Sequence, residues 1–208
     1  MVHLQQGPCE LSQHALDFFL MKAFRFFATC TLAIALSSAS DARAQNLSVD
    51  IHGAMALVSY SKLNVEGGFG GTFGAHPAFF FHKSLGVFAG VDYITRPMAL
   101  NTSSSTKWLE FPLGLAFRSG EGASQLIGLG LSISTPLSDF EDVSRTYETQ
   151  GGVSLILVTN RYYEIDPMFS LGIYSDIRYS FHSPFADAAL SDGRVFSFDI
   201  GLGARMNL

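Results

Sequence analysis

Residues 108–118 read Trp-Leu-Glu-Phe-Pro-Leu-Gly-Leu-Ala-Phe-Arg, and a large apolar side chain stands at every second position. These apolar side chains share one face of an extended chain and are Leu109, Phe111, Leu113, Leu115 and Phe117. Successive side chains of a β-strand point to opposite faces, so a period of two predicts a strand with one apolar face and one polar or small face.

The same period predicts seven further strands after residue 45. Apolar residues alternate with polar or small ones in residues 47–57, 73–81, 87–93, 127–133, 153–157, 163–181 and 196–208. Helical spacing is hard to find in this part of the chain, which favours an all-β protein of eight strands.

The connections between the predicted strands alternate in length. Short turns are expected near residues 82–85, 119–122 and 159–161. Long loops are expected over residues 61–71, 96–105, 136–148 and 183–192. This alternation is typical of an antiparallel membrane barrel, in which one rim carries long loops and the other carries tight turns.

Composition narrows the class of protein. Of 208 residues, 48% are apolar, 15% are charged and 20 are glycine, with a net charge of −5. So few charges argue against a disordered chain, and the acidic balance gives no footprint for a nucleic-acid partner.

Residues 21–44 have the three parts of a secretory signal peptide. Lys22 and Arg25 precede an apolar stretch over residues 26–36, and Ala-Arg-Ala at 42–44 is a cleavage site of small residues. The apolar stretch is too short to span a bilayer as a helix.

The domain expected after cleavage therefore runs from residue 45 to 208, with Gln45 first. Residues 1–20 do not read as the start of a signal peptide and are predicted to be an extension of the gene model. Both cysteines, Cys9 and Cys30, precede Gln45, so we expect neither a disulfide framework nor a thiolate metal site in the barrel domain.

Alternation alone fits two barrels with opposite faces. A soluble lipocalin-like carrier would turn the apolar face inward, whereas a membrane barrel turns it to lipid. The polar phase is rich in Gly, Ala and Ser, as a narrow interior requires, and aromatic residues gather towards strand ends. We therefore predict an eight-stranded antiparallel up-and-down transmembrane β-barrel, with Leu113 and Leu171 near mid-strand on its lipid face.

Two stretches resemble the small, porin-like outer-membrane β-barrel proteins. Residues 108–115 resemble the aromatic-Leu-Glu-Ile-Pro-Leu stretch of such domains. Residues 196–208 resemble their C-terminal insertion signal, with Leu208 where the signal usually has Phe or Trp. The apolar phase of that segment is Phe196, Phe198, Ile200, Leu202, Met206 and Leu208. The resemblance implies a place in the Gram-negative outer membrane, with outer-membrane lipid, lipopolysaccharide and the barrel-assembly machinery as partners.

Charged residues in the polar phase are predicted to face the lumen. They are Asp92, Glu110, Arg118, Glu164, Asp166, Asp176, Arg178, Asp199 and Arg205. They could form a polar path or proton relay, or an ion-pair network that plugs the barrel. An eight-stranded interior is just wide enough for side chains to fill, which favours the plug.

No catalytic, cofactor-binding or metal-binding residue is predicted. Outer-membrane lipid A deacylases are also small barrels and use His and Ser two positions apart on one strand face. Ser180 and His182 share such a face in reversed order, with Asp176 further along, whereas Ser183 lies on the opposite face. A rim histidine is the favoured interpretation, and a lipid A-modifying enzyme stays the alternative.

The other polar motifs give weaker indications of a binding site. His52, His76 and His82 stand singly, without the spacing of zinc ligands. The acidic loop residues Asp139, Glu141, Asp142 and Glu148 could bind a divalent cation that bridges lipopolysaccharide, but a solvated face is favoured. The expected function is thus a non-enzymatic outer-membrane barrel with a plugged polar interior, whose loops serve envelope structure or surface interaction with a partner that is not identified.

Overall fold

The computed structural model describes residues 47–61, 65–99, 103–119, 123–141, 146–187 and 192–208. The predicted extension, signal peptide and first residue Gln45 lie outside these ranges. Within the described part, no helix is long and apolar enough to cross a membrane.

The described residues form antiparallel strands. Their bounds are β1 Leu47–Ser61, β2 Gly68–Phe80, β3 Leu85–Ala89, β4 Val91–Ala99, β5 Ser103–Ser119, β6 Ala123–Pro136, β7 Phe140–Glu141, β8 Thr146–Tyr147, β9 Gly152–Asp166, β10 Phe169–Ser180 and β11 Arg194–Asn207. Strands β3 and β4 flank Gly90 and both pair with β2 and with β5, so they act as one barrel strand. The short β7–β8 hairpin lies apart from the barrel sheet.

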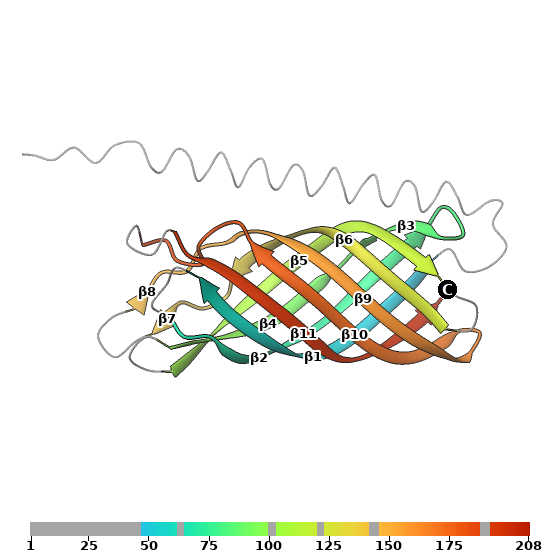
Figure 1. The fold of residues 1–208 in the computed structure, drawn as a ribbon, viewed down its shortest axis with the longest axis horizontal. Helices are drawn as coiled ribbons and strands as arrows, with labels where there is room; N and C mark the ends of the chain where they lie inside the picture. Colours follow the sequence, from blue (N-terminus) through green and yellow to red (C-terminus); the bar gives the residue numbers. More distant parts are fainter. Residues whose placement is uncertain (1–46, 62–64, 100–102, 120–122, 142–145, 188–191) are drawn as a thin grey trace, which may run out of the picture. The chain divides into compact units, whose positions relative to one another are not determined.

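The sheet closes on itself, as Figure 1 shows. Each barrel strand pairs with the next in sequence, and β11 returns to pair with β1 from Ser48–Asn207 to Ser61–Arg194. Closure leaves no unpaired strand edge, which a lipid environment demands. With β3 and β4 taken together, the predicted eight-stranded antiparallel barrel is confirmed.

Two predicted strand boundaries are wrong. The segment 163–181 is not one strand, because β9 ends at Asp166 and β10 begins at Phe169. The Asp166 carboxylate closes this turn by accepting hydrogen bonds from the amides of Met168 (2.8 Å) and Phe169 (2.9 Å). The predicted turn at 159–161 lies inside β9, and most of the predicted loop at 96–105 belongs to β4 and β5.

The two rims of the barrel differ. The short turns β2–β3 and β9–β10 share one rim with the C-terminus, and the β7–β8 hairpin lies at the other rim (Figure 1). In outer-membrane barrels the short turns face the periplasm and the long loops face the exterior. The rim with β7 and β8 is therefore called the loop rim below.

The outer face of the barrel is apolar. Large exposed side chains occur on every barrel strand, up to 73% exposure at Phe69 and 75% at Leu202, whereas Asp50, Asp92 and Glu110 are almost fully buried. A soluble carrier would bury the large apolar side chains and expose the charged ones. The structure thus contradicts the lipocalin-like alternative, and the apolar phase forms a lipid-facing belt.

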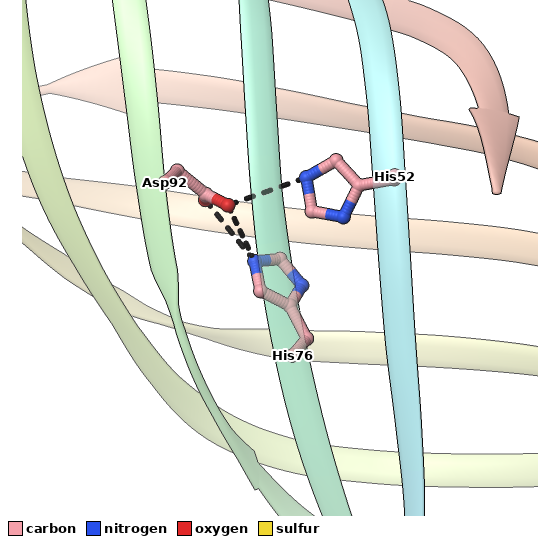
Figure 2. Close-up of side chains that lie close together, drawn as sticks. All are labelled: His52, His76 and Asp92. Atoms are coloured by element: carbon pink, nitrogen blue, oxygen red, sulfur yellow. Dashed lines mark hydrogen bonds and ion pairs between the residues drawn. The ribbon is translucent and has the colours of Figure 1, made fainter. Parts of the chain in front are cut away.

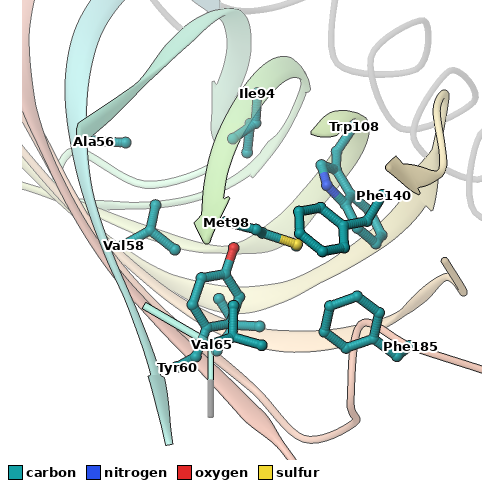
Figure 3. Packing of buried hydrophobic residues seen from close by; sticks show 10 residues of the cluster. Ala56, Val58, Tyr60, Val65, Ile94, Met98, Trp108, Phe140 and Phe185 are labelled. Carbon is teal, nitrogen blue, oxygen red and sulfur yellow. The ribbon is translucent and has the colours of Figure 1, made fainter. Parts of the chain in front are cut away.

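Buried side chains occupy the described lumen near both rims and between them. Apolar residues pack towards the turn rim, including Ala78, Phe80, Phe88, Ala116 and Leu126. A second apolar cluster lies at the loop rim and contains Tyr60, Met98, Trp108, Phe140 and Phe185 (Figure 3). Asp92, Glu110, Asp176 and Arg178 lie between the two clusters along their strands.

Glycine allows this packing at Gly172, where a Cβ would lie 2.0 Å from the carbonyl oxygen of Arg161 and 2.7 Å from the Cα of Tyr162. We expect Gly172→Ala to lower the free energy of unfolding by about 1–3 kcal/mol, as overpacking does. At Gly53 the nearest atom to an added Cβ is 3.9 Å away, so Gly53→Ala should have no such effect. Urea unfolding in detergent compares Gly172→Ala with Gly53→Ala, and equal midpoints would contradict the close approach of β9 and β10 at Gly172. An arginine at Gly172 or Gly114 should prevent folding.

Candidate functional site

Arg178 on β10 is the centre of the buried charges and is 2% exposed. Its guanidinium group donates to Asp176 (2.9 and 2.7 Å), to Asp92 Oδ2 (3.0 Å) and to Glu110 Oε2 (3.0 Å). Asp199 lies at 4.0 Å. One side chain thus links carboxylates from four strands, β4, β5, β10 and β11.

Further polar groups extend this network. Glu110 also pairs with Arg96 and accepts a hydrogen bond from the Ser132 hydroxyl group (3.0 Å). The Thr72 hydroxyl group donates to Asp199, and the Tyr174 hydroxyl group donates to Asp176. We call this set, together with Asp92 and Arg178, the Arg178 network.

Within the described residues, the Arg178 network contains more negative than positive charge. Its four carboxylates are Asp92, Glu110, Asp176 and Asp199, and its two guanidinium groups are Arg96 and Arg178. With neutral histidines and all four carboxyl groups ionised, the excess is two negative charges. Buried ions require compensation, so the network favours uptake of a proton or binding of a cation.

Two histidines adjoin the network through strand register. His52 on β1 pairs with Gly74 on β2, and Gly74 pairs in turn with Asp92 on β4. A Cβ on Gly74 would lie 1.8 Å from Asp92 Oδ1, so the glycine leaves the space in which His52 and Asp92 meet. His76, two residues along β2, completes the group (Figure 2).

The three side chains converge on one carboxylate. His76 Nε2 is hydrogen-bonded to Asp92 Oδ1 (2.9 Å) and Oδ2 (3.1 Å), and His52 Nε2 lies 3.2 Å from Oδ1. The ring of His52 stacks on Tyr174 with centroids 3.6 Å apart and planes 4° apart. One ligand atom from each residue of this His52–His76–Asp92 group lies within 4.8 Å of the other two, so the group could hold a metal ion.

A second ion pair lies where the first strand meets the last. Arg205 on β11 donates to both oxygens of Asp50 on β1, at 2.7 and 3.0 Å. The Asn160 amide group donates to Asp50 (3.1 Å), and the Arg205 guanidinium carbon lies 4.3 Å from the centre of the Tyr162 ring.

Comparisons with known proteins agree on the architecture. No protein-family model and no curated protein matches the sequence. Neisserial surface protein A is similar in structure, with a TM-score of 0.58 and 16% identity over 80% of this chain and 100% of that one. OprG from Pseudomonas aeruginosa has a TM-score of 0.54 and 14% identity, covering 79% and 98% of the two chains. The outer membrane protein AlkL in lipid bilayers reaches 0.52 with 12% identity, covering 82% and 94%.

The chain has the fold of the small outer-membrane β-barrels. The predicted fold class and the resemblance to this group are thereby confirmed. The outer-membrane location agrees with the apolar belt and with these neighbours.

Of the nine charged residues predicted to line the lumen of this outer-membrane barrel, five lie in the Arg178 network. They are Asp92, Glu110, Asp176, Arg178 and Asp199. Arg205 belongs to the second ion pair. Arg118 is half-buried towards the turn rim and lies over the ring of Phe80 at 4.5 Å.

The other two predicted residues, Glu164 and Asp166, are outside the lumen. Both are exposed at the end of β9, where the strand gives way to the β9–β10 turn. The period of two also assigns Met168 to the inward phase, but its side chain is 61% exposed in that turn. These residues are exposed because the β9–β10 hairpin turns here, so the chain extends beyond the barrel instead of continuing as one strand.

Several buried residues of the outer-membrane barrel were not predicted as site residues. Arg96 stands inside a predicted loop, although Ile94, Arg96 and Met98 continue the period of two and all three are buried in β4. Asp50 stands in the polar phase of the first predicted strand without an expected partner. His52 and His76 come together only through the pairing of β1 with β2, which their spacing in sequence does not reveal.

The residues considered for lipid A hydrolysis do not form a catalytic arrangement. The Ser180 hydroxyl group donates to the backbone carbonyl of His182 (2.7 Å) and accepts from the His182 amide (3.3 Å). Ser180 is half-buried at the end of β10 and His182 is exposed just beyond it, whereas Asp176 is buried in the Arg178 network. The structure therefore does not join the Ser180 hydroxyl group, the His182 imidazole and the Asp176 carboxylate in one series of side-chain hydrogen bonds.

The acidic loop residues are dispersed. Asp139 accepts hydrogen bonds from the amide (3.0 Å) and hydroxyl group (3.3 Å) of Thr149, which is a structural role within the loop. Glu141 is exposed on β7, and Asp142 lies outside the described residues. The apolar phase of β11, which carries the predicted insertion signal from Phe196 to Leu208, is on the lipid-facing side.

Proposed function

We propose that this chain is a non-enzymatic outer-membrane barrel whose loop rim is its working surface. The observation that carries the proposal is the filled lumen. The Arg178 network crosses its middle, and an apolar cluster with Met98, Trp108 and Phe140 covers it at the loop rim (Figure 3). A lumen filled in this way supports a structural role for the barrel rather than passage of solutes.

The long loops are joined to one another, which supports a surface role. Gln150, before β9, donates through its side-chain amide to the carbonyls of Phe185 (2.7 Å) and Ser183 (3.3 Å). Its backbone amide donates to Pro184 (2.9 Å), and Phe185 packs edge-on against Phe140 with ring centroids 6.0 Å apart. The described parts of these two loops thus contact each other at the loop rim, and we call them the platform.

This platform is the surface we assign to envelope structure or to contact with outside partners. Outer-membrane lipid and lipopolysaccharide are the expected neighbours of the apolar belt. The barrel-assembly machinery is the expected partner of β11 during insertion. No arrangement among the described residues favours a hydrolase over this assignment.

The purified protein should show no stable porin-like conductance in planar bilayers, because side chains of an eight-stranded barrel fill its interior. Steady ohmic channels of large conductance, in a preparation free of other porins, would contradict the filled lumen.

Mass spectrometry of lipid A from cells with and without the protein tests whether the barrel is non-enzymatic. Unchanged lipid A is expected, and deacylated lipid A that requires the protein would overturn the non-enzymatic assignment.

A further inference from the structure

We propose that His52, His76 and Asp92 bind one divalent transition-metal ion of the Zn²⁺ class inside the lumen. The proposal goes beyond the surface role of the loops and rests on a different part of the molecule. Three kinds of observation support it: the geometry of the donor atoms, the unsatisfied polar atoms of His52 and the charge around the group.

Two of the three donor pairs are already spaced nearly as ligands of one ion, and all three donor atoms lie within 4.8 Å of one another. Zinc binds imidazole nitrogens and carboxylate oxygens at about 2.0–2.2 Å, so two ligands of a tetrahedral site lie roughly 3.3 Å apart. Asp92 Oδ1 is 3.2 Å from His52 Nε2 and 2.9 Å from His76 Nε2. Shifts of a few tenths of an ångström would therefore bring each of these two His–Asp92 pairs to ligand spacing.

His52 is unsatisfied within the described structure. Its side chain is fully buried, yet neither ring nitrogen has a hydrogen-bond partner, and its contact with Asp92 lies outside hydrogen-bond geometry. Buried polar groups almost always have partners, and an ion is one of the recognised explanations when none is found. The Nε2 atom of His52 faces Asp92 Oδ1 at 3.2 Å, on the side where the ion would lie (Figure 2).

The surroundings would hold both the ion and its ligands. Arg178 binds the second carboxylate oxygen of Asp92 at 3.0 Å and so fixes its orientation, as outer groups do in metal sites. A divalent ion would also balance the two excess negative charges of the Arg178 network. Two nitrogen donors and one oxygen donor suit Zn²⁺, Cu²⁺ or Ni²⁺ rather than Mg²⁺ or Ca²⁺, which prefer oxygen ligands.

Two glycines keep the space that this site needs. A Cβ on Gly74 would lie 1.8 Å from Asp92 Oδ1, and a Cβ on Gly90 would lie 2.2 Å from His76 Cδ2. Any larger residue at either position would displace a ligand. The site would connect β1, β2 and β4 through three ligands, which leaves the fourth position of a tetrahedral ion for another donor such as water.

The test uses the purified protein refolded into detergent with Zn²⁺ present, because the ligands are buried once the barrel has closed. After removal of loose metal, we expect one zinc per chain by elemental analysis. Co²⁺ in place of Zn²⁺ should give the visible absorption bands of a tetrahedral site. Heat-modifiable mobility on gels verifies that each sample contains the folded barrel.

The variants His52→Phe and His76→Gln should lower zinc affinity by more than about 100-fold, because even outer groups of metal sites change affinity 10–100-fold. Phe at position 52 keeps the stacking on Tyr174. The control His82→Ala/His182→Ala removes two exposed histidines and should still bind one zinc.

Three results would overturn the proposal. They are a wild-type protein that retains no zinc, a folded His52→Phe or His76→Gln variant that retains zinc as the wild type does, and loss of zinc from the control. If neither ligand variant folds, the Co²⁺ spectrum of the wild type decides, since octahedral or absent bands would exclude the site.

Discussion

The variant Arg178→Met is expected not to reach the folded barrel in detergent or lipid. Arg178 makes hydrogen-bonded ion pairs with Asp92, Glu110 and Asp176, all of them buried. Removing one partner of a buried pair costs about 3–5 kcal/mol, because it leaves an uncompensated charge. Here a single change removes the arginine from three carboxylates, of which Glu110 keeps its pair with Arg96. Heat-modifiable mobility and urea titration measure the fraction that folds.

Arg118→Met is the matched control for this prediction. Arg118 has the same side chain and also lies in the inward phase, but it is half-buried and lies over Phe80 apart from the Arg178 network. Its loss should change stability far less. A folded Arg178→Met variant with the wild-type urea midpoint would show that the buried carboxylates do not depend on this arginine.

The second large effect is expected for Leu113→Arg on the lipid-facing belt. Leu113 is 37% exposed and lies near the middle of β5, with Leu131 beside it on β6. Arginine at the bilayer midplane of such barrels costs about 2–4 kcal/mol. Unfolding from lipid vesicles in denaturant measures this loss.

Leu171, which lies closer to the membrane interface than Leu113, provides the control for this prediction. Leu171 was expected near mid-strand, but β10 begins at Phe169, so Leu171 is close to the turn rim. Arginine near a membrane interface costs only about 0–1 kcal/mol, and Leu171→Arg should therefore be mild. If Leu113→Arg were as stable as Leu171→Arg, the belt would not be in contact with the bilayer core.

The faces of the strands could be predicted from the sequence because side-chain direction alternates strictly along a strand. Strand ends were harder, and the β9–β10 turn shows why. Tyr163 and Ile165 on β9 face outward, and so do Leu171 and Ile173 on β10. All have odd numbers, so the alternation stays in phase through the hairpin and the turn leaves no break in the pattern.

The candidate metal group could not be predicted for a different reason. Its residues come from three strands, and only the pairing register places His52 and Asp92 on either side of Gly74. The period of two tells which side chains face inward but not which of them lie at the same level. Charged residues such as Asp176 and Arg178 were easier, because they are two positions apart on one strand.

The ion pair between Asp50 and Arg205 joins residues 155 positions apart, on the first and last strands. During synthesis and insertion, Asp50 has no arginine partner on β11 until that strand has arrived. An unpaired charge resists transfer into lipid, so an open sheet that lacks β11 is at a disadvantage at the membrane. The ion pair between β1 and β11 therefore favours insertion of the closed barrel over insertion of a partly assembled sheet.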